Sequence, residues 1–262
     1  MKPEQTLAWM HDGTRRLLAD VAGLTDAALE TPTALPGWSR RYLLAHVAAN
    51  AGALGNLVHW ARTGEERRMY ASNEQRDADI AAGAARPAAE LRAWLTSSAQ
   101  ALAADLGALP DDAWPAKVIT AQGLTRSASE IPWMRDREVY IHAVDLGAGT
   151  TFADLPDGFL TALLDDVTAR RSAKGGGPAL AVAATDTGHA WYVGAEDGRL
   201  QPRREPPGSD PAGPAACTVA GPASGVYLFL WHRSDAAQAG VTISGDPGFL
   251  ERWQSSVRVR WD

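Results

Sequence analysis

An acidic and a basic side chain stand four positions apart in the segment WMRDREVYIHAVDLG, residues 133–147. Positions i and i+4 lie on the same side of an α-helix, so the carboxylate of Glu138 and the imidazole of His142 can point at one object. That object is solvent, the partner side chain or a metal ion. Taken alone, the pair is more simply an exposed contact within one helix.

A third candidate ligand, His46, lies in the apolar segment RRYLLAHVAANAGAL, residues 40–54. Taken alone, His46 is most simply a core histidine bonded to a backbone carbonyl, because buried polar groups need partners. If two neighbouring helices of a bundle turn these faces inward, however, His46, Glu138 and His142 meet at one point. Two imidazoles and one carboxylate suit Zn²⁺ and leave one coordination position open. Iron or nickel also accept these ligands, so the sequence predicts a divalent metal, with zinc preferred.

Several polar residues near these candidates have two interpretations. Arg135, Arg137 and Asp145 neighbour the ligand pair and could orient it, but solvated helix surface is the interpretation we favour. Asn50 lies one turn from His46 and suits either a ligand contact or helix packing. The other histidines lack a second candidate ligand in helical register; they are His11, His59, His189 and His232.

Four long segments with helical spacing of apolar residues must position the candidates. Ser39 is a plausible N-cap for the second segment, which Gly64 ends, and Ser129 and Gly147 bound the fourth in the same way. A polar stretch between the second and third segments predicts a loop with a short helix. The four segments are 4–23, 39–63, 87–107 and 129–147. Their number and connections predict a four-helix bundle.

The pattern changes near residue 150. A further helix is expected at 157–172, followed by the short β-like runs ALAVAA, HAWYV and CTVAG. A Pro- and Gly-rich loop at 202–216 and two helical patterns at 222–233 and 247–255 complete the chain. The fold class is therefore α+β, with a bundle at 1–152 and a small α+β domain at 153–262.

Composition excludes several classes of protein. The net charge of the 262 residues is −6 and no basic run occurs, which argues against nucleic acid as a partner. No apolar run reaches the length of a membrane span, and the polar start does not resemble a signal peptide. The lone Cys217 excludes an internal disulfide and fits a reducing cytoplasm. The oligomeric state stays open, with a monomer as one option.

Two long stretches resemble one known family. They are LPGWSRRYLLAHVAANAGALGNLVHWARTGEERRMYASNEQRDADI and ITAQGLTRSASEIPWMRDREVYIHAVDLG, the second continuing into FADLP. Both resemble the mycothiol-dependent maleylpyruvate isomerases, which belong to the DinB-like metal-binding bundles. The segment LFLWHRSDAAQAGVTISG resembles part of the family's small, sterol-carrier-protein-like C-terminal domain.

The resemblance implies an activity and a site. The family's zinc ligands fall on His46, Glu138 and His142, and its catalytic arginine falls on Arg233, in a C-terminal domain expected to contribute to the active-site cleft. The family converts 3-maleylpyruvate to 3-fumarylpyruvate, a cis–trans isomerisation in the gentisate pathway of aromatic degradation. Its cofactor is the low-molecular-weight thiol mycothiol, so the implied partners are a small-molecule substrate and a thiol.

An external thiol agrees with the cysteine content. Rotation about a C=C bond requires its temporary loss, which reversible thiolate addition provides, and Cys217 is more simply a small buried apolar residue. One alternative is a mycothiol S-transferase acting on another electrophile on the same scaffold. Another is a non-catalytic metal- or ligand-binding module, although a structural zinc usually has a fourth protein ligand and no convincing fourth is found.

Overall fold

The computed structural model describes residues 3–172, 179–196, 199–209 and 215–255. The chain divides into two compact units, Met1–Phe152 and Ala153–Asp262. Within the described ranges no helix is long and apolar enough to cross a bilayer.

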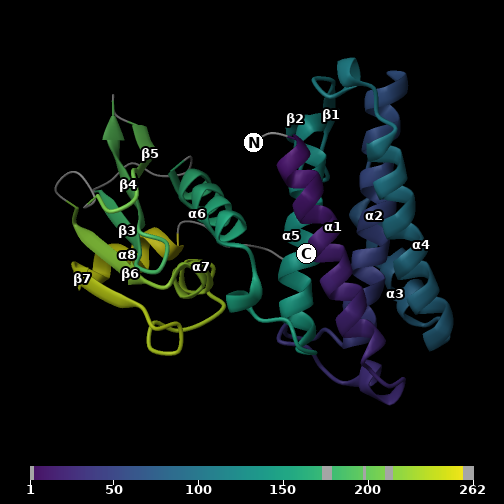
Figure 1. The fold of residues 1–262 in the computed structure, drawn as a ribbon, viewed down its shortest axis with the longest axis horizontal. Helices are drawn as coiled ribbons and strands as arrows, with labels where there is room; N and C mark the ends of the chain where they lie inside the picture. The colour runs from purple at the N-terminus through teal and green to yellow at the C-terminus, as the bar shows by residue number, and fades with distance from the viewer. Residues whose placement is uncertain (1–2, 173–178, 197–198, 210–214, 256–262) are drawn as a thin grey trace. The chain divides into compact units, whose positions relative to one another are not determined.

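Four long helices form the bundle of the first unit (Figure 1). The helix α1 packs along α5, while α2 packs against both α4 and α5, and a shorter helix, α3, packs on α2. This arrangement confirms the predicted four-helix bundle. The bounds are Pro3–Ala22 for α1, Arg40–Thr63 for α2, Asn73–Ala84 for α3, Ala88–Gly107 for α4 and Ile131–Leu146 for α5.

The interior of the bundle is apolar along most of its length. One cluster of buried side chains includes Leu17, Leu43 and Leu95, and a second includes Leu54 and Leu102. The helix α2 contributes to both, and its inner residues are close to fully buried. Burial of this kind, rather than helix propensity, provides most of the stability of a bundle.

The connection between α4 and α5 contains structure that the sequence did not predict. The strands β1 (Lys117–Ile119) and β2 (Thr125–Ser127) pair as an antiparallel hairpin. A short 3₁₀ helix, η3 (Ala128–Glu130), then leads directly into α5. The predicted cap at Ser129 is therefore wrong, because the Glu130 carboxylate accepts the backbone N–H of Ser127 at 3.2 Å and begins the turn earlier.

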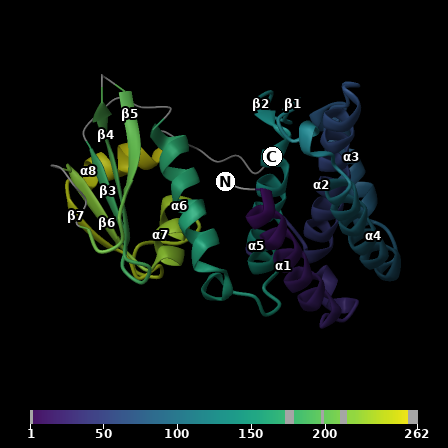
Figure 2. The same ribbon diagram turned by 45° about the horizontal axis from the view of Figure 1, so that its top comes forward.

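The second unit contains a five-stranded sheet with strand order β5-β4-β3-β6-β7 (Figures 1 and 2). The strands β3 and β6 run parallel, and the other neighbouring pairs are antiparallel. In the centre of the sheet, Val182 of β3 is the register partner of Trp191 on β4 and of Val219 on β6. The strands are β3 (Leu180–Ala184), β4 (His189–Glu196), β5 (Arg199–Glu205), β6 (Cys217–Gly221) and β7 (Thr242–Gly245).

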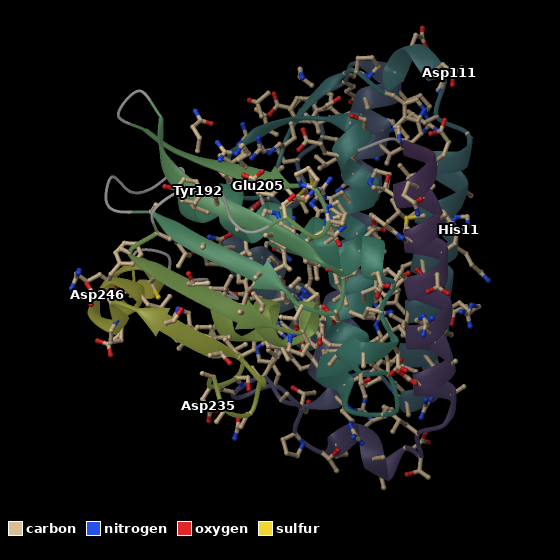
Figure 3. The ribbon with its side chains drawn as sticks, turned by 60° about the vertical axis from the view of Figure 1, so that its left-hand side comes forward. His11, Asp111, Tyr192, Glu205, Asp235 and Asp246 are labelled. Carbon is tan, nitrogen blue, oxygen red and sulfur yellow. The ribbon has the colours of Figure 1, made fainter. Side chains whose placement is uncertain are left out.

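Two helices, α6 (Asp157–Ser172) and α7 (Ala223–Leu230), cover one face of this sheet (Figure 2). A third helix, α8 (Pro247–Ser255), follows β7 and contacts β6. The sequence predicted β3, β4 and β6 but not the two edge strands. It assigned the last part of β5, residues 202–205, to a loop at 202–216, of which residues 210–214 lie outside the described ranges. Figure 3 labels Tyr192 on β4 and Glu205 on β5.

Candidate metal centre

Two helices carry the three candidate ligands, and local signals set their ends. In α2 the Ser39 hydroxyl accepts the backbone N–H of Tyr42 at 3.2 Å, and Gly64 ends the helix with a φ of 77°. In α5 Pro132 occupies the first turn and Gly147 ends the helix with a φ of 61°. Left-handed backbone at a helix end favours glycine, so both predicted ends are confirmed.

An arginine fixes the start of α2 to the end of α5. The guanidinium of Arg40 donates from Nε to the carbonyl of Leu146 and from Nη2 to that of Gly147, each at 2.8 Å. These carbonyls have no partner within their own helix, and a cation there also complements the helix dipole. The contact fixes the position of α2 along the axis of α5, and therefore the level at which His46 faces Glu138 and His142.

The structure brings the three predicted residues together. The Nε2 atom of His46 lies 2.9 Å from Oε2 of Glu138, and Nε2 of His142 lies 3.3 Å from the same oxygen. One donor atom from each residue lies within 4.8 Å of the others. Both histidines are buried, whereas 27% of the Glu138 side chain is exposed. The cluster is therefore accessible at its carboxylate.

The environment of His142 favours a fixed tautomer. Its Nδ1 lies 2.8 Å from Oδ2 of Asp145, which is itself buried. A proton held on Nδ1 leaves the lone pair of Nε2 directed at the cluster, the arrangement that carboxylates give to metal-binding histidines. We had expected Asp145 on solvated helix surface, and this expectation is wrong.

The cluster carries strongly shifted pKa values. Burial would raise the pKa of Glu138, but hydrogen bonds from His142 and His46 outweigh it and hold that pKa well below its usual range. Burial lowers the pKa of His46 despite the nearby Glu138. Burial also opposes the charged form of His142, but Asp145 and Glu138 raise its pKa to about 9. Metal binding at Nε2 would therefore compete with a proton on His142.

Arg135 was expected at the surface, but it is among the most buried large side chains of the chain, with 1% of the residue exposed. Its Nη1 donates to the carbonyl of Val47 at 2.7 Å and to Oδ1 of Asn50 at 2.9 Å. Burial lowers the pKa of Arg135 to about 10, which leaves it charged at neutral pH. Asn50 therefore serves helix packing, and Arg135 binds the turn of α2 that carries His46.

An aromatic side chain, Trp38, adjoins the cluster, although the sequence favoured a place in the core for it. The ring of Trp38 meets that of His46 edge-on, with centroids 5.0 Å apart, and stacks on that of His142 at 6.1 Å. Burial raises the pKa of Tyr70 to about 12, so its phenol stays protonated at neutral pH. The tryptophan stands in the loop before α2, and no spacing rule connects it with residues of α5.

The two other residues singled out from the sequence belong to the second unit. Arg233 follows α7 and is half-buried, and its backbone N–H donates to the carbonyl of Leu228 at 2.8 Å. The preceding residue, His232, has a φ of 56°, a conformation that non-glycine residues rarely adopt. Cys217 is buried in β6, and burial raises the pKa of its thiol.

Fold and site together define a class: a helical-bundle protein with a buried His–Glu–His cluster, followed by a small α+β unit. Residues 10–147 match the mycothiol maleylpyruvate isomerase N-terminal domain, and residues 154–252 match the MDMPI C-terminal domain. The chain therefore belongs to the mycothiol-dependent maleylpyruvate isomerase family.

Solved structures agree with this assignment. A crystal structure of the mycothiol-dependent maleylpyruvate isomerase is 36% identical and superposes with a TM-score of 0.78 over 93% of each chain. A crystal structure of a histidine-to-alanine variant of that enzyme is 35% identical, with the same TM-score and coverage. A comparison with curated proteins found no match.

Proposed function

We propose that this protein is a mycothiol-dependent isomerase that converts 3-maleylpyruvate to 3-fumarylpyruvate, as a step of aromatic degradation through gentisate. The observation that carries the proposal is the likeness over 93% of both chains to enzymes named for this activity, at 35–36% identity. A fold alone does not imply a function, but the site offers chemistry that suits the reaction.

The donor set fits a divalent metal, with zinc as our proposed ion. His46 and His142 would bind it through Nε2 and Glu138 through a carboxylate oxygen, since these atoms already converge. The Asp145 carboxylate would keep the proton of His142 on Nδ1. A metal held there would supply a Lewis-acidic position that favours the thiolate form of a thiol. Because Glu138 is the accessible ligand, substrate and thiol would approach from its side.

The attacking thiol is proposed to be mycothiol rather than a cysteine of this chain. Addition of a thiolate to the C=C bond leaves a single bond and moves an electron pair to the substrate's carbonyl oxygen as an enolate. Rotation and loss of the thiolate then give the trans isomer. Cys217 suits none of these steps, because it is buried in β6 and its raised pKa disfavours the thiolate.

We propose Arg233 as the catalytic cation. Both substrate carboxylates and the developing enolate are negative, and a guanidinium can bind such oxygens through two parallel N–H groups. In the first unit, Arg135 is buried and uses Nη1 on Val47 and Asn50. The unusual backbone of His232 supports a specific orientation for Arg233, since strained conformations persist where the surroundings or function require them.

A single assay tests this function. Metal-loaded protein, mycothiol and maleylpyruvate are incubated together, and chromatography follows the cis and trans isomers. We expect turnover that requires the thiol, disappears on chelation and returns with zinc. Cys217→Ala should remain active.

Each expected outcome of this assay can be contradicted by a specific result. Undiminished isomerisation without thiol would overturn the mycothiol step, and undiminished isomerisation after complete metal removal would overturn the metal centre. Accumulation of a stable mycothiol–substrate adduct without trans product would identify an S-transferase instead.

A further inference from the structure

A cavity opens between α1 and α4, within the first unit and apart from the metal cluster. Its volume is about 380 Å³, and its walls are mainly apolar, formed by side chains such as Met10, Leu18, Leu102 and Ala103. This volume falls in the range of small-molecule sites, which are mostly apolar with a few polar groups. None of the three candidate metal ligands lines it.

A charged side chain, Arg135 of α5, contributes to the wall of this α1/α4 cavity. Arg135 lines the cavity although only 1% of the residue is exposed. Its Nη1 is used twice, on Val47 and Asn50, whereas its Nη2 is buried without a hydrogen-bond partner among the described residues. A buried N–H of a charged group that lacks an acceptor is costly, so an acceptor from outside the chain would be stabilised there.

The neighbouring carboxylates do not supply this acceptor, since that of Asp136, the next residue of α5, is itself buried without a hydrogen-bond partner in the part of the chain that the structure describes. The Glu138 carboxylate one turn away is engaged by the imidazoles of His46 and His142. The lining also includes Arg15, whose guanidinium is paired with Asp12, and His11, which Figure 3 labels on α1. No carboxylate lines the cavity. An anion would therefore complement the charge of the Arg135 guanidinium.

We propose that the α1/α4 cavity binds a small monocarboxylate with an apolar body, such as an aromatic acid. The carboxylate accepts from Nη2 of Arg135, and the ring or alkyl group packs against the aliphatic walls. The single unpartnered donor group, Nη2 of Arg135, suits one carboxylate. Inorganic phosphate requires several donors and has no apolar part to fill the apolar remainder of the cavity. The proposal is independent of the isomerase activity, because the cavity excludes the metal ligands.

The test compares benzoate with benzamide, which has nearly the same shape but no charge. Each is titrated into metal-loaded protein, and amide chemical shifts in α1 and α4 report the dissociation constant. We expect benzoate to bind at least about tenfold more tightly than benzamide, by analogy with other charge-assisted hydrogen bonds. Equal affinities would overturn the proposal.

Two variants on α4 locate the site. Ala103→Phe fills part of the cavity while leaving Arg135 and the metal ligands unsubstituted, and it should weaken benzoate binding about tenfold or more. Ala104→Phe is the matched control, because Ala104 is exposed and does not line the cavity. Unchanged benzoate affinity in Ala103→Phe would mean that benzoate binds elsewhere, including at the metal, and would contradict the proposal.

Arg135→Met tests the charge directly. In this variant the preference for benzoate over benzamide should disappear, and its persistence would overturn the role of the guanidinium. Because Arg135 also binds α2, the variant is used only if it retains helical circular dichroism. The benzamide comparison and Ala103→Phe decide the matter if it does not fold.

Discussion

The two units of the chain bury different kinds of side chain. In the first, two neighbouring helices, α2 and α5, enclose ionisable groups: His46, Arg135, Asp136, His142 and Asp145. In the second, the buried polar side chains among the described residues are Thr161 and Thr168. Moving a charged group from water into the protein interior costs several kcal/mol, which is comparable to the net free energy of unfolding of a whole domain. Concentration of such groups on two facing helices therefore indicates chemistry rather than packing.

The second unit is organised around apolar contacts across its sheet. Val182, Trp191 and Val219 are close to fully buried, and the Trp191 indole donates to Asp165 at 2.8 Å. This interior can hold a sheet together, but the described residues of the unit form no cluster of metal ligands. Arg233 differs from these residues, because the family resemblance assigns it a catalytic role. The contrast between the two units is tested by replacing charged side chains in each unit. Metal content, isomerase activity and the free energy of unfolding are then measured separately.

The largest effect is expected from Glu138→Gln. The amide keeps the shape but removes the only negative ligand, so metal content should fall from one ion per chain to a small fraction and activity should be lost. Metal analysis after gel filtration and the isomerase assay measure both. Glu90→Gln, at an exposed position of α4, is the control and should change neither. Full metal occupancy in Glu138→Gln would exclude this carboxylate as a ligand.

A smaller loss is expected from Arg233→Ala. Removing one charge-stabilising group typically reduces turnover by about ten- to thousandfold. Metal content and melting temperature should stay unchanged, and Arg233→Lys should recover only part of the activity because lysine lacks the planar fork. Arg252→Ala, an exposed arginine of the same unit, serves as control. Near-normal turnover of Arg233→Ala at saturating substrate and thiol would make this arginine structural.

Much of the bundle follows from local signals in the sequence. Ser39, Gly64 and Gly147 bound their helices as expected, because capping depends on neighbours a few residues away. The meeting of His46 with Glu138 and His142 also follows from helical register once two helices are assumed to face each other. Metal binding itself stays a prediction.

The missed features depend on distant partners. Arg135 was expected in solvent because arginine is rarely buried, and its acceptors Val47 and Asn50 lie on another helix. The edge strands β5 and β7 show little apolar alternation, because β5 is rich in arginine and β7 has four mostly exposed residues. Pro202 within β5 even argued for a loop, although proline is tolerated at an edge.

A third prediction concerns the partner of His142. Asp145→Asn removes the negative charge that holds the imidazole proton on Nδ1, and loss of such a partner typically weakens metal affinity by about 10- to 100-fold. Competition with a chelator of known zinc affinity measures this change. Saturating zinc should restore most of the activity, which distinguishes a positioning residue from a ligand. Unchanged affinity would show that the 2.8 Å contact has no influence on the metal.

The smallest effect is expected at Asp12, which links α1 to α5 near the surface of the bundle. Its Oδ2 accepts from the Tyr140 hydroxyl at 2.9 Å and from Arg16 at 2.7 Å, and its Oδ1 accepts from Arg15. Burial would raise the pKa of Asp12, but hydrogen bonds from Arg16, Arg15 and Tyr140 outweigh it and lower that pKa. The contact therefore stabilises the fold at pH values above the unfolded pKa of the group, roughly 4. This contribution decreases as the pH falls through the lower pKa of the folded state.

Asp12→Asn should accordingly reduce the free energy of unfolding at pH 7 by about 0.2–1 kcal/mol, as partly exposed ion pairs do. Near pH 3 the difference should shrink, and urea unfolding of both proteins at the two pH values measures it. Asp105→Asn is the matched control, because its ion pair with Arg62 is longer, at 3.9 Å. An equal loss at pH 3 and pH 7 would attribute the effect to the Tyr140 hydrogen bond rather than to charge. The metal ligands respond to pH in the same way in wild type and variant, so their contribution cancels in the difference between the two unfolding free energies. That difference therefore reports the ion pairs of Asp12 and not the buried charges of the bundle.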